Sequence, residues 1–381
     1  MIADRIDRRI DVAVNLLWIA PGRVGGSEQY LERQLLGLSA PDVRVAVHCT
    51  RAFAAAHRDL AERHAQVLAP GGQDWRGGRI AAEHTWLALR TRHADVVHHG
   101  GGTAPIVGRR PIVLTVHDLQ YLTFPRYFSR ARRAYLDAMV PRSIERAAVV
   151  TVPSRYVRGT VIDAFGIDPE RVVVVPHGIP AMFDSTPAHL AAVRRRAGLA
   201  DRPYVVYPAI THPHKGHLVL VDMLDHLDPE VQLVLLGGEG AAEPAVRSAI
   251  AASSHGDRVH RLGRVDDRER DALLAHAEAL VFPSEYEGFG APLVEAMALG
   301  TPVVCSTAAA VVEVVADAAV VVHEPMGAAW ADAVATARAR RGELARQGHA
   351  RRADFTLATS GDALAAAYRA ALATGHGSVR S

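Results

Sequence analysis

Short runs of β-branched and other apolar residues alternate with longer stretches of helical period along the whole chain. The first series of runs lies at 10–14, 43–48, 95–98, 111–116, 149–152 and 172–175. The second series lies at 204–207, 232–236, 259–262, 279–282, 302–305 and 319–322. These runs lack the polar alternation of half-exposed strands, and Ala-, Arg- and Leu-rich stretches separate them. Parallel strands with helices on both faces have this pattern, so we predict an α/β fold.

The strand series starts twice, which indicates two domains. "VVVVPHGIP" closes the first series, "AMFDSTPAHL" connects, and "RPYVVYPA" opens the second series. A chain of 381 residues is long enough for two ordinary domains. We predict doubly wound, Rossmann-like domains over 1–180 and 181–365, and a flexible tail over 366–381 because "ATGHGSVRS" is small and polar. We expect the last helix to pack back on the N-terminal domain.

Composition narrows the class of protein. Apolar residues make up 49% of the chain, enough to build real cores, and a net charge of +2 gives no argument for nucleic acid. The two cysteines, Cys49 and Cys305, fall in separate predicted strands, as expected of core residues in a reducing compartment. The N-terminal stretch does not read as a signal peptide, and no stretch reaches the ~18 apolar residues of a membrane span. We expect a cytoplasmic protein.

One local cluster of basic residues breaks the even charge pattern. It consists of Arg126, Arg130, Arg132, Arg133, Arg142 and Arg146. The cluster predicts either peripheral contact with the inner face of a membrane or simply a solvated helix face.

In open parallel sheets, ligands bind at the carboxyl ends of the strands, so the residues after each strand are the candidates for a site. After the first strand, "APGRVGGSEQYLERQLLGL" places Gly25 and Gly26 directly before Ser27, a suitable helix N-cap. Paired glycines allow close approach of the backbone to an anion, although a flexible turn explains them as well. The segment is neither a dinucleotide fingerprint nor a P-loop, which disfavours NAD and ATP.

In "VLTVHDLQYL", His117 and Asp118 follow a strand immediately. A histidine there can bind a sugar hydroxyl or assist proton transfer, or it can cap the strand and bond to Asp118. In "YPAITHPHKGHL", Lys215 follows a strand, and Gly216 lets the chain turn into the next helix. A lysine at this point offers a positive charge to phosphate oxygens, or is a solvated surface residue.

"PSEYEGFGAPLVEAMALGTPVV" combines a loop over 283–290 with a helix that ends near Leu299, before Gly300. We expect Glu287 in the loop and Glu295 in the first helical turn. The two carboxylates are an acid/base pair, two handles on one ligand, or unrelated charges; the amides around Gly288–Gly290 favour two handles beside a diphosphate.

At this point the ordered set of motifs resembles the GT-B retaining glycosyltransferases of family 4. The set comprises the "GG" loop, "HD", "VPHG", "HKGH", "LLGGEG", "RLGRVDDRE" and the E-x7-E segment, and it covers essentially the whole chain. The resemblance implies two Rossmann-like domains that face a central cleft, a nucleotide-sugar donor held mainly by the C-terminal domain, and no required metal or other cofactor.

The resemblance also implies roles for individual residues. His117 and Glu287 would act at the transferred sugar, Glu295 would hold the ribose, and Lys215 would meet the diphosphate. The further donor-binding candidates are Gly25, Gly26, Thr211, Gly237, Arg264, Gly288, Phe289 and Gly290, and the acceptor-binding candidates are Asp118 and Tyr121. One departure stands out: many family members carry an Arg shortly before the Lys, where this chain has Ala209, Ile210 and Thr211. Either Thr211 and loop amides suffice, or an Arg from elsewhere substitutes.

The resemblance favours mannose from GDP-mannose over UDP-glucose or dTDP-sugars, with a glycan, lipid-linked or small-molecule hydroxyl as acceptor. Three alternatives stay open: a GT-B sugar-nucleotide epimerase, a phosphorylase, and a non-catalytic protein that binds sugar nucleotides. The basic residues Arg126, Arg130, Arg132 and Arg133 are the candidates for membrane contact.

Overall fold

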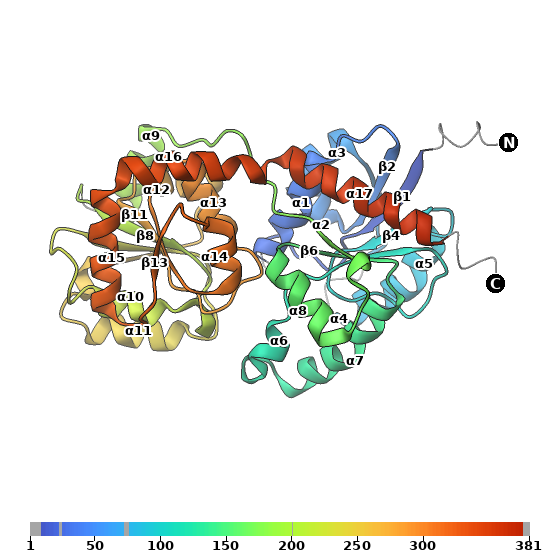
Figure 1. Cartoon of the computed structure of the whole chain (residues 1–381), viewed down its shortest axis with the longest axis horizontal. Coiled ribbons are helices and arrows are strands. Elements are labelled where there is room, and N and C mark those ends of the chain that lie inside the picture. Colours follow the sequence, from blue (N-terminus) through green and yellow to red (C-terminus); the bar gives the residue numbers. More distant parts are fainter. Residues whose placement is uncertain (1–8, 23–24, 72–75, 200, 376–381) are drawn as a thin grey trace. The chain divides into compact units, whose positions relative to one another are not determined.

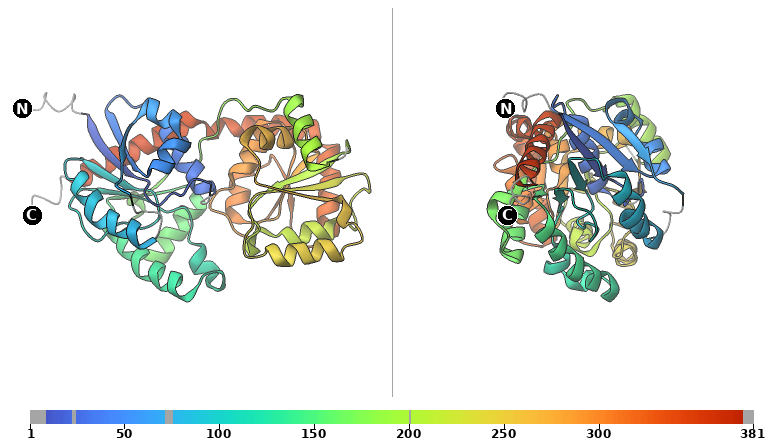
Figure 2. Two further views of the ribbon diagram at one scale, coloured as in Figure 1. Left: turned by 180° about the vertical axis from the view of Figure 1, so that it is seen from behind. Right: turned by 90° about the vertical axis from the view of Figure 1, so that its right-hand side faces the viewer.

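The computed structural model describes residues 9–22, 25–71, 76–199 and 201–375. The chain divides into two compact units, the first made of residues 1–178 and 356–381, the second of 179–355. Each unit is a parallel sheet with helices on both faces (Figures 1 and 2). The predicted α/β fold with two Rossmann-like domains is confirmed.

Unit 1 contains a seven-stranded sheet of order β3-β2-β1-β4-β5-β6-β7, and every pair in it is parallel. The strands are β1 (Ile10–Asn15), β2 (Val43–Cys49), β3 (Ala65–Leu68), β4 (Val96–His99), β5 (Ile112–Thr115), β6 (Val149–Val152) and β7 (Val172–Val174). The sequence misses only β3, because this four-residue strand lies at the sheet edge and has no buried residue.

The helices of unit 1 connect these strands in chain order. They are α1 (Gly26–Gly37), α2 (Arg51–Ala56), α3 (Arg58–Arg63), α4 (Arg76–Ala82), the π-helix η2 (Glu83–Leu87), α5 (Ala88–Arg90), α6 (Gln120–Thr123), the 3-10 turn η3 (Pro125–Tyr127), α7 (Arg130–Arg146), α8 (Arg155–Phe165), η4 (Pro169–Arg171) and α17 (Leu357–Gly375). Capping residues set several ends: the Ser154 hydroxyl accepts from Val157 N at the start of α8, and Gly166 ends it with φ 61°.

The last helix belongs to unit 1, although unit 2 separates it from the rest of that unit along the chain. α17 packs on α1, where a Cβ on Gly37 would overlap the Leu357 carbonyl oxygen, and a Cβ on Gly361 would overlap that of Gly37. Two glycines therefore allow the backbones to approach closely. The tail predicted over 366–381 needs correction, because residues 366–375 continue α17; residues 376–381 lie outside the described residues. The chain passes from unit 1 to unit 2 between residues 178 and 179 and returns to unit 1 between residues 355 and 356. Unit 2 therefore ends ten residues before the predicted boundary at 365.

Unit 2 contains a six-stranded parallel sheet of order β10-β9-β8-β11-β12-β13. Its strands are β8 (Tyr204–Pro208), β9 (Gln232–Leu236), β10 (Val259–Gly263), β11 (Ala279–Phe282), β12 (Val303–Ser306) and β13 (Val320–Val322). Its helices are α9 (Pro187–Ala197), η5 (Pro213–Lys215), α10 (His217–Met223), α11 (Glu243–Ala252), η6 (Gly256–Arg258), α12 (Asp267–Ala275), α13 (Ala291–Ala298), α14 (Ala309–Val315), α15 (Gly327–Ala339), α16 (Arg341–Arg352) and η7 (Ala353–Phe355).

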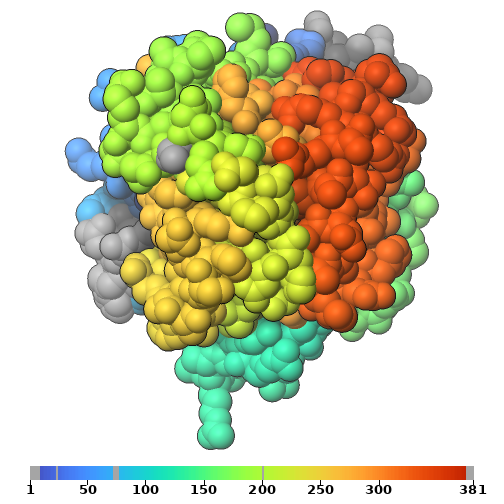
Figure 3. Space-filling model, turned by 90° about the vertical axis from the view of Figure 1, so that its left-hand side faces the viewer, coloured from blue at the N-terminus to red at the C-terminus, as the bar shows by residue number. Residues whose placement is uncertain are grey.

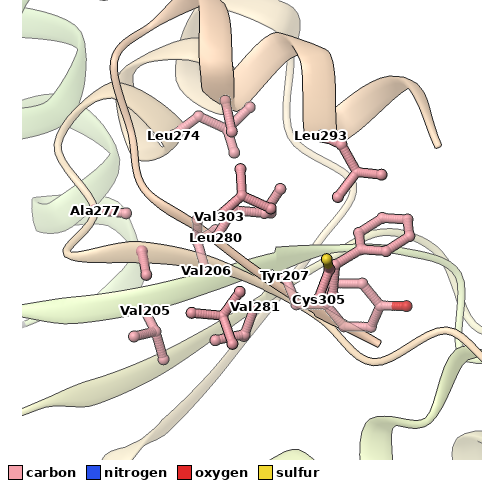
Figure 4. Close-up of a cluster of buried hydrophobic side chains, with 14 of the residues drawn as sticks. Val205, Val206, Tyr207, Leu274, Ala277, Leu280, Val281, Leu293, Val303 and Cys305 are labelled. Atoms are coloured by element: carbon pink, nitrogen blue, oxygen red, sulfur yellow. The ribbon is translucent and has the colours of Figure 1, made fainter. Parts of the chain in front are cut away.

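The core of unit 2 forms where the central strands meet α12 and α13 (Figure 4). Val206 of β8, Leu280 of β11 and Val303 of β12 are fully buried beneath Leu274 and Leu293. Cys305 belongs to this core, and burial raises the pKa of its thiol to about 12; burial likewise raises that of Cys49 in unit 1 to about 11. Both cysteines are therefore inert core residues, as predicted.

One hollow of unit 2 lies on the side of the sheet away from the candidate residues. It has a volume of about 720 Å³ and is lined by α9 together with Asp201 and His276. These last two residues precede β8 and β11, so the hollow lies at the amino ends of the strands. Figure 3 shows one face of unit 2, on which the surfaces of yellow-green and of orange-red segments adjoin. Among the described residues, no helix combines the length and apolar character that crossing a membrane requires.

The glycines between α1 and α17 give a test of the fold. Gly37→Ala should lower the free energy of unfolding by about 1–3 kcal/mol, because the added methyl group overlaps a backbone oxygen. Gly159→Ala in α8 is the matched control: a Cβ there meets no atom within 4 Å, and alanine favours the helix by up to about 1 kcal/mol. Chemical denaturation followed by circular dichroism measures both. Equal stability of the two variants would contradict the close α1–α17 packing.

Candidate active site

Two loops at the carboxyl edge of the unit 2 sheet are tied together. The loop after β8 runs from Ala209 to Gly216, and the loop after β11 runs from Pro283 to Gly290. The Tyr207 hydroxyl donates to the Lys215 carbonyl at 2.9 Å and lies 2.9 Å from the Ser284 hydroxyl, and Glu285 N donates to the His214 carbonyl at 2.8 Å. These bonds hold both loops in one arrangement.

An ion pair joins the side chains of the same two loops. Lys215 Nζ lies 2.6 Å from Glu287 Oε1, with the side chains 19% and 12% exposed. The sequence shows further that Lys215 is the only lysine of the chain. The two residues are 72 positions apart in the sequence, so the sequence alone does not reveal this contact. The structure thus brings together two of the predicted site residues.

Glu295 lies one helical turn further along α13 than the sequence predicts. α13 begins at Ala291 after Gly290, so Glu295 is in the second turn of the helix and not in the first. Its side chain is almost fully buried, with 2% of the residue exposed, and its Oε2 lies 3.9 Å from Arg270 Nε. The predicted end of this helix is right: Gly300, at φ 72°, donates to Met297 O, and Thr301 N donates to Ala296 O.

The glycine turn before α13 has mixed roles. Gly290 has φ 98°, a backbone conformation that favours glycine. The Phe289 side chain is 4% exposed and packs edge-on against Phe355, with ring centroids 5.3 Å apart, which leaves the predicted contact through its backbone amide untested. The side chain of Phe289 is part of the core, and only its backbone can serve a ligand.

The structure contradicts the donor contact that the sequence predicted for Thr211. This residue is fully buried; its hydroxyl donates to Glu243 Oε2 at 2.7 Å and accepts from Gly240 N at 2.7 Å. Glu243 also accepts from Arg261 Nη2 at 2.5 Å. Thr211 therefore fixes the loop after β9 from inside the protein and cannot contact a diphosphate, which removes it as a substitute for the missing Arg.

Two further donor candidates of unit 2, Gly237 and Arg264, lie at the same sheet edge. Gly237 has φ 110°, and a Cβ on it would overlap the Ala209 carbonyl oxygen, so the packing of two loops already requires glycine there. Arg264 is exposed in the loop after β10, and its Nε would lie 3.3 Å from a Cβ on Gly238. Arg264 is thus the predicted donor contact that carries a positive charge besides Lys215.

In unit 1, the glycine pair and His117 lie after β1 and β5. Gly25 precedes α1 with φ 71°, and a Cβ on Gly26 would meet no atom within 4 Å. The space beside Gly26 would let a ligand approach its backbone closely. Residues 23 and 24 of the same loop lie outside the described residues.

His117 is held by the backbone and not by Asp118. Its Nε2 donates to the Gly100 carbonyl at 2.8 Å, which leaves Nδ1 as an acceptor. Burial lowers the pKa of His117 and outweighs its hydrogen bond to Gly100 and the charge of Asp118, so the ring is neutral at neutral pH. A neutral acceptor suits a hydroxyl group of a ligand.

The two acceptor-binding candidates differ. Asp118 is exposed, and its Oδ1 accepts from Gln120 N at 2.9 Å, which starts α6. Tyr121 is a correction: it is 5% exposed within the core that also contains Val140, and burial raises the pKa of its hydroxyl to about 12. Its side chain is a core group.

Four arginines of the basic cluster, Arg126, Arg130, Arg132 and Arg133, are exposed. Arg126 lies 5.0 Å over the ring of Tyr127, Arg132 lies 5.2 Å over that of Phe128, and Arg133 pairs with Asp137 at 3.5 Å. Aromatic and acidic neighbours thus hold three of these charges.

Family models match both halves of the chain. Residues 24–182 match "Glycosyltransferase Family 4", and residues 192–353 match "Glycosyl transferases group 1". A D-inositol 3-phosphate glycosyltransferase of Salinispora arenicola is 30% identical over 344 residues, which cover 82% of this chain and 67% of that protein. The chain belongs to glycosyltransferase family 4.

Other relatives of this family 4 chain have different substrates in their names. The O-antigen chain mannosyltransferase B of Escherichia coli is 29% identical over 239 residues, and the match spans 61% of this chain and 62% of that protein. The solved structure of Anabaena Alr3699/HepE in complex with UDP and glucose superimposes with a TM-score of 0.75 at 21% identity, over 94% of this chain and 99% of that one. This likeness establishes the GT-B fold.

The sequence missed one charged group of the family 4 chain, His57. Its Nδ1 donates to Glu32 Oε1 at 2.7 Å and its Nε2 donates to Glu28 Oε1 at 2.8 Å, while Glu28 Oε2 accepts from Gly22 N at 2.9 Å. Burial lowers the pKa of His57, but the hydrogen bonds and negative charges of Glu28 and Glu32 outweigh it and raise that pKa to about 10. A helix spacing of four residues placed both carboxylates on one face of α1, which is the signal that the sequence contained.

The hydrogen bonds of His57 also exclude this histidine as a metal ligand. Among the described residues, one group of possible metal ligands occurs, Glu32, His57 and Asp59. Because both ring nitrogens of His57 donate hydrogen bonds to carboxylates, neither offers a lone pair to a metal. The imidazolium instead fixes Glu28, which in turn accepts the hydrogen bond from Gly22 N.

The charge of His57 predicts an alkaline loss of stability. The folded-state pKa of about 10 exceeds the ordinary value of 6.5, so the contribution is complete below pH 6.5 and is lost as the pH rises towards 10. Within that window the free energy of unfolding should fall by up to about 1.4 kcal/mol per pH unit relative to the variant His57→Gln. Denaturant titrations of both proteins at several pH values measure the difference. Parallel pH profiles would refute the assignment.

Proposed function

We propose that this family 4 glycosyltransferase transfers a hexosyl group from a nucleotide-sugar to a hydroxyl acceptor with retention of anomeric configuration. The observation that carries the proposal is the Lys215–Glu287 pair of 2.6 Å at the carboxyl edge of the unit 2 sheet. A cation for phosphate and a carboxylate for sugar hydroxyls then stand side by side, as a nucleotide-sugar requires.

Lys215 meets the diphosphate in this proposal. The turn Gly288–Gly290 leads directly into α13, and the positive end of a helix dipole favours a nearby anion, so we place the diphosphate at this turn as well. Thr211 is excluded by its burial, so loop amides and an exposed Arg supply what the missing Arg would. Arg264 is our candidate, because it lies at the same sheet edge.

Glu287 and His117 act on the transferred sugar. An ionised carboxylate accepts from two hydroxyl groups at once, and the neutral His117 offers Nδ1 as a further acceptor. Glu295 holds the ribose hydroxyls. Its burial means that a Glu295 variant changes the core as well as the site, which makes Lys215 and Glu287 the better targets for mutation.

Transfer then follows a front-face course. The acceptor oxygen bonds to the anomeric carbon on the side from which the diphosphate departs; the anomeric C–O bond to phosphate breaks, and its electron pair stays on the leaving phosphate. The acceptor proton passes to that phosphate oxygen. The chain's own residues stabilise the leaving charge and orient the sugar, and we expect this chemistry without a metal ion.

For the donor we propose GDP-mannose. The similarity to a mannosyltransferase of O-antigen chains supports mannose, whereas the fold relative in complex with UDP and glucose leaves UDP-glucose as the competing donor. The acceptor is a glycan, a lipid-linked sugar or a small-molecule alcohol. For a lipid-linked acceptor, the exposed arginines Arg126, Arg130, Arg132 and Arg133 are the candidates for contact with anionic lipid.

Variants of the ion pair test the site. Lys215→Met should weaken GDP binding by about 10- to 100-fold, because it removes a charge-assisted phosphate contact. Calorimetry with GDP and with UDP measures the loss, and Arg195→Met on the exposed face of α9 is the control for a lost cation. Equal affinities of Lys215→Met and the parent protein would remove Lys215 from the site.

Glu287→Gln should reduce turnover by at least about 10-fold while nucleotide affinity stays within about 3-fold, because the lost charge faces the sugar and not the base. Glu285→Gln, an exposed residue of the same loop, is the matched control and should keep normal turnover. A fall in nucleotide affinity alone would contradict the role of Glu287.

A thermal-shift screen tests the donor. Bound ligand raises the melting temperature by mass action, so GDP-mannose should produce the largest increase among GDP-, UDP-, dTDP- and ADP-sugars. A larger shift with UDP-glucose would overturn the mannose assignment but not the enzyme class. Release of free sugar or of an epimer without acceptor would instead identify one of the competing activities.

A further inference from the structure

A cavity of about 480 Å³ lies in unit 1, on one face of the sheet. It exists because the connection between β4 and β5, residues 100–111, contains no helix, whereas every other connection of this sheet contains one. Val97, His99 and Ile112 form its floor, η2 and α5 form one wall, and residues 105–110 form the other. The cavity extends from the end of β4 back to Thr91 and Arg110, which precede β4 and β5, so it runs along the sheet face and not along the carboxyl edge.

The inner end of the cavity contains a fixed polar network. Asn15 Oδ1 accepts from Leu17 N at 3.1 Å, so its Nδ2 group must donate. The two hydrogens of Nδ2 go to Glu83 Oε1 and to His99 Nδ1, each at 3.2 Å. Asn15 and His99 are only 2% and 4% exposed, which shows that the network is built into the fold.

This network assigns hydrogen-bonding roles to the groups that line the cavity. Because Asn15 donates to His99 Nδ1, the ring must carry its proton on Nε2. Burial, aided by the nearby charge of Arg146, lowers the pKa of His99 to about 3 and keeps this tautomer neutral. His99 thus offers a donor at Nε2, and Glu83 offers an acceptor at Oε2. One donor beside one acceptor is the pair that a hydroxyl group needs.

The outer end of the cavity is cationic. Arg92, Arg109 and Arg110 line it and are exposed. Arg110 Nε donates to the Arg92 carbonyl at 3.0 Å, and Arg146 donates to the carbonyls of Pro105 and Gly108, which fixes the wall between them. Between the two ends the lining is apolar, with Leu87, Val97 and Ile112.

We infer that this cavity binds a phosphorylated polyol, a compound with several hydroxyl groups and one phosphate ester. The hydroxyl groups reach Glu83 and His99, the C–H faces of the polyol pack on the apolar lining, and the phosphate meets the arginines at the mouth. The volume suits a molecule of one or two sugar rings. This site is separate from the one at the strand edge and stands independently of the proposed transfer reaction.

Calorimetry on the full chain with glucose 6-phosphate as the probe tests the inference. Glucose 6-phosphate should bind at least about 10-fold more tightly than glucose or inorganic phosphate, because only it contacts both ends of the cavity. Ala88→Phe, which fills the cavity from α5, should abolish that binding. Arg109→Ala should weaken it about 3- to 10-fold, and Arg58→Ala, an exposed arginine of α3, should not change it.

Each result decides for or against the site. Binding of glucose 6-phosphate that is the same in Ala88→Phe and the parent protein, or no binding at all, would overturn the inference. Circular dichroism checks the fold of Ala88→Phe; if this variant does not fold, the comparison of Arg109→Ala with Arg58→Ala decides, and equal affinities overturn the inference.

A second arm identifies the source of the phosphate. Flotation with phosphatidylcholine vesicles, with and without phosphatidylglycerol, shows whether a lipid headgroup also occupies the cavity. Vesicle binding that requires phosphatidylglycerol and is lost in both Ala88→Phe and Arg109→Ala supports a headgroup as ligand. Binding of glucose 6-phosphate without vesicle binding supports a free polyol phosphate.

Discussion

The ion pair between Lys215 and Glu287 is the contact on which the candidate site depends. It joins two loops whose strands, β8 and β11, are neighbours in a parallel sheet, so both loops must leave the sheet at the same edge. Hydrogen bonds from Tyr207 and Glu285 hold the backbones of these loops, and the ion pair then fixes the only lysine of the chain beside a carboxylate. The arrangement of the candidate site thus depends on topology first and on side chains second.

Three histidines of unit 1 differ in charge because their surroundings differ. Burial keeps His99 and His117 neutral, which makes each a defined donor or acceptor for hydroxyl groups. His57 is buried as well, yet two carboxylates of α1 hold it as a cation. The charged histidine fixes Glu28 of α1, whereas the neutral His99 lines the cavity of unit 1. Both uses follow from the number of carboxylates within reach.

The sequence predicted the strands well because fully buried parallel strands are runs of Val, Ile and Leu, and it missed β3 because an exposed edge strand has no such run. It located Lys215, Glu287, His117 and Gly26 near strand ends, where the structure has them. It failed for Thr211 and Tyr121, since a position after a strand does not reveal whether a side chain turns to the core or to solvent. It misplaced Glu295 by one turn because the helix begins at Ala291, close to Gly290. The pairing of His57 with Glu28 needed three-dimensional contact to be seen.

Because Lys215 is the single lysine of the chain, its chemical modification tests directly whether it contacts the diphosphate of a nucleotide-sugar. The protein is treated with an acetylating reagent in the presence and absence of GDP or UDP, and mass spectrometry follows the modification of Lys215 over time. The α-amine at the start of the chain is the internal control, because it reacts in the same solution. If Lys215 contacts the diphosphate, a nucleoside diphosphate slows acetylation of Lys215 and leaves the α-amine unaffected. Equal rates at Lys215 with and without saturating nucleotide would contradict it.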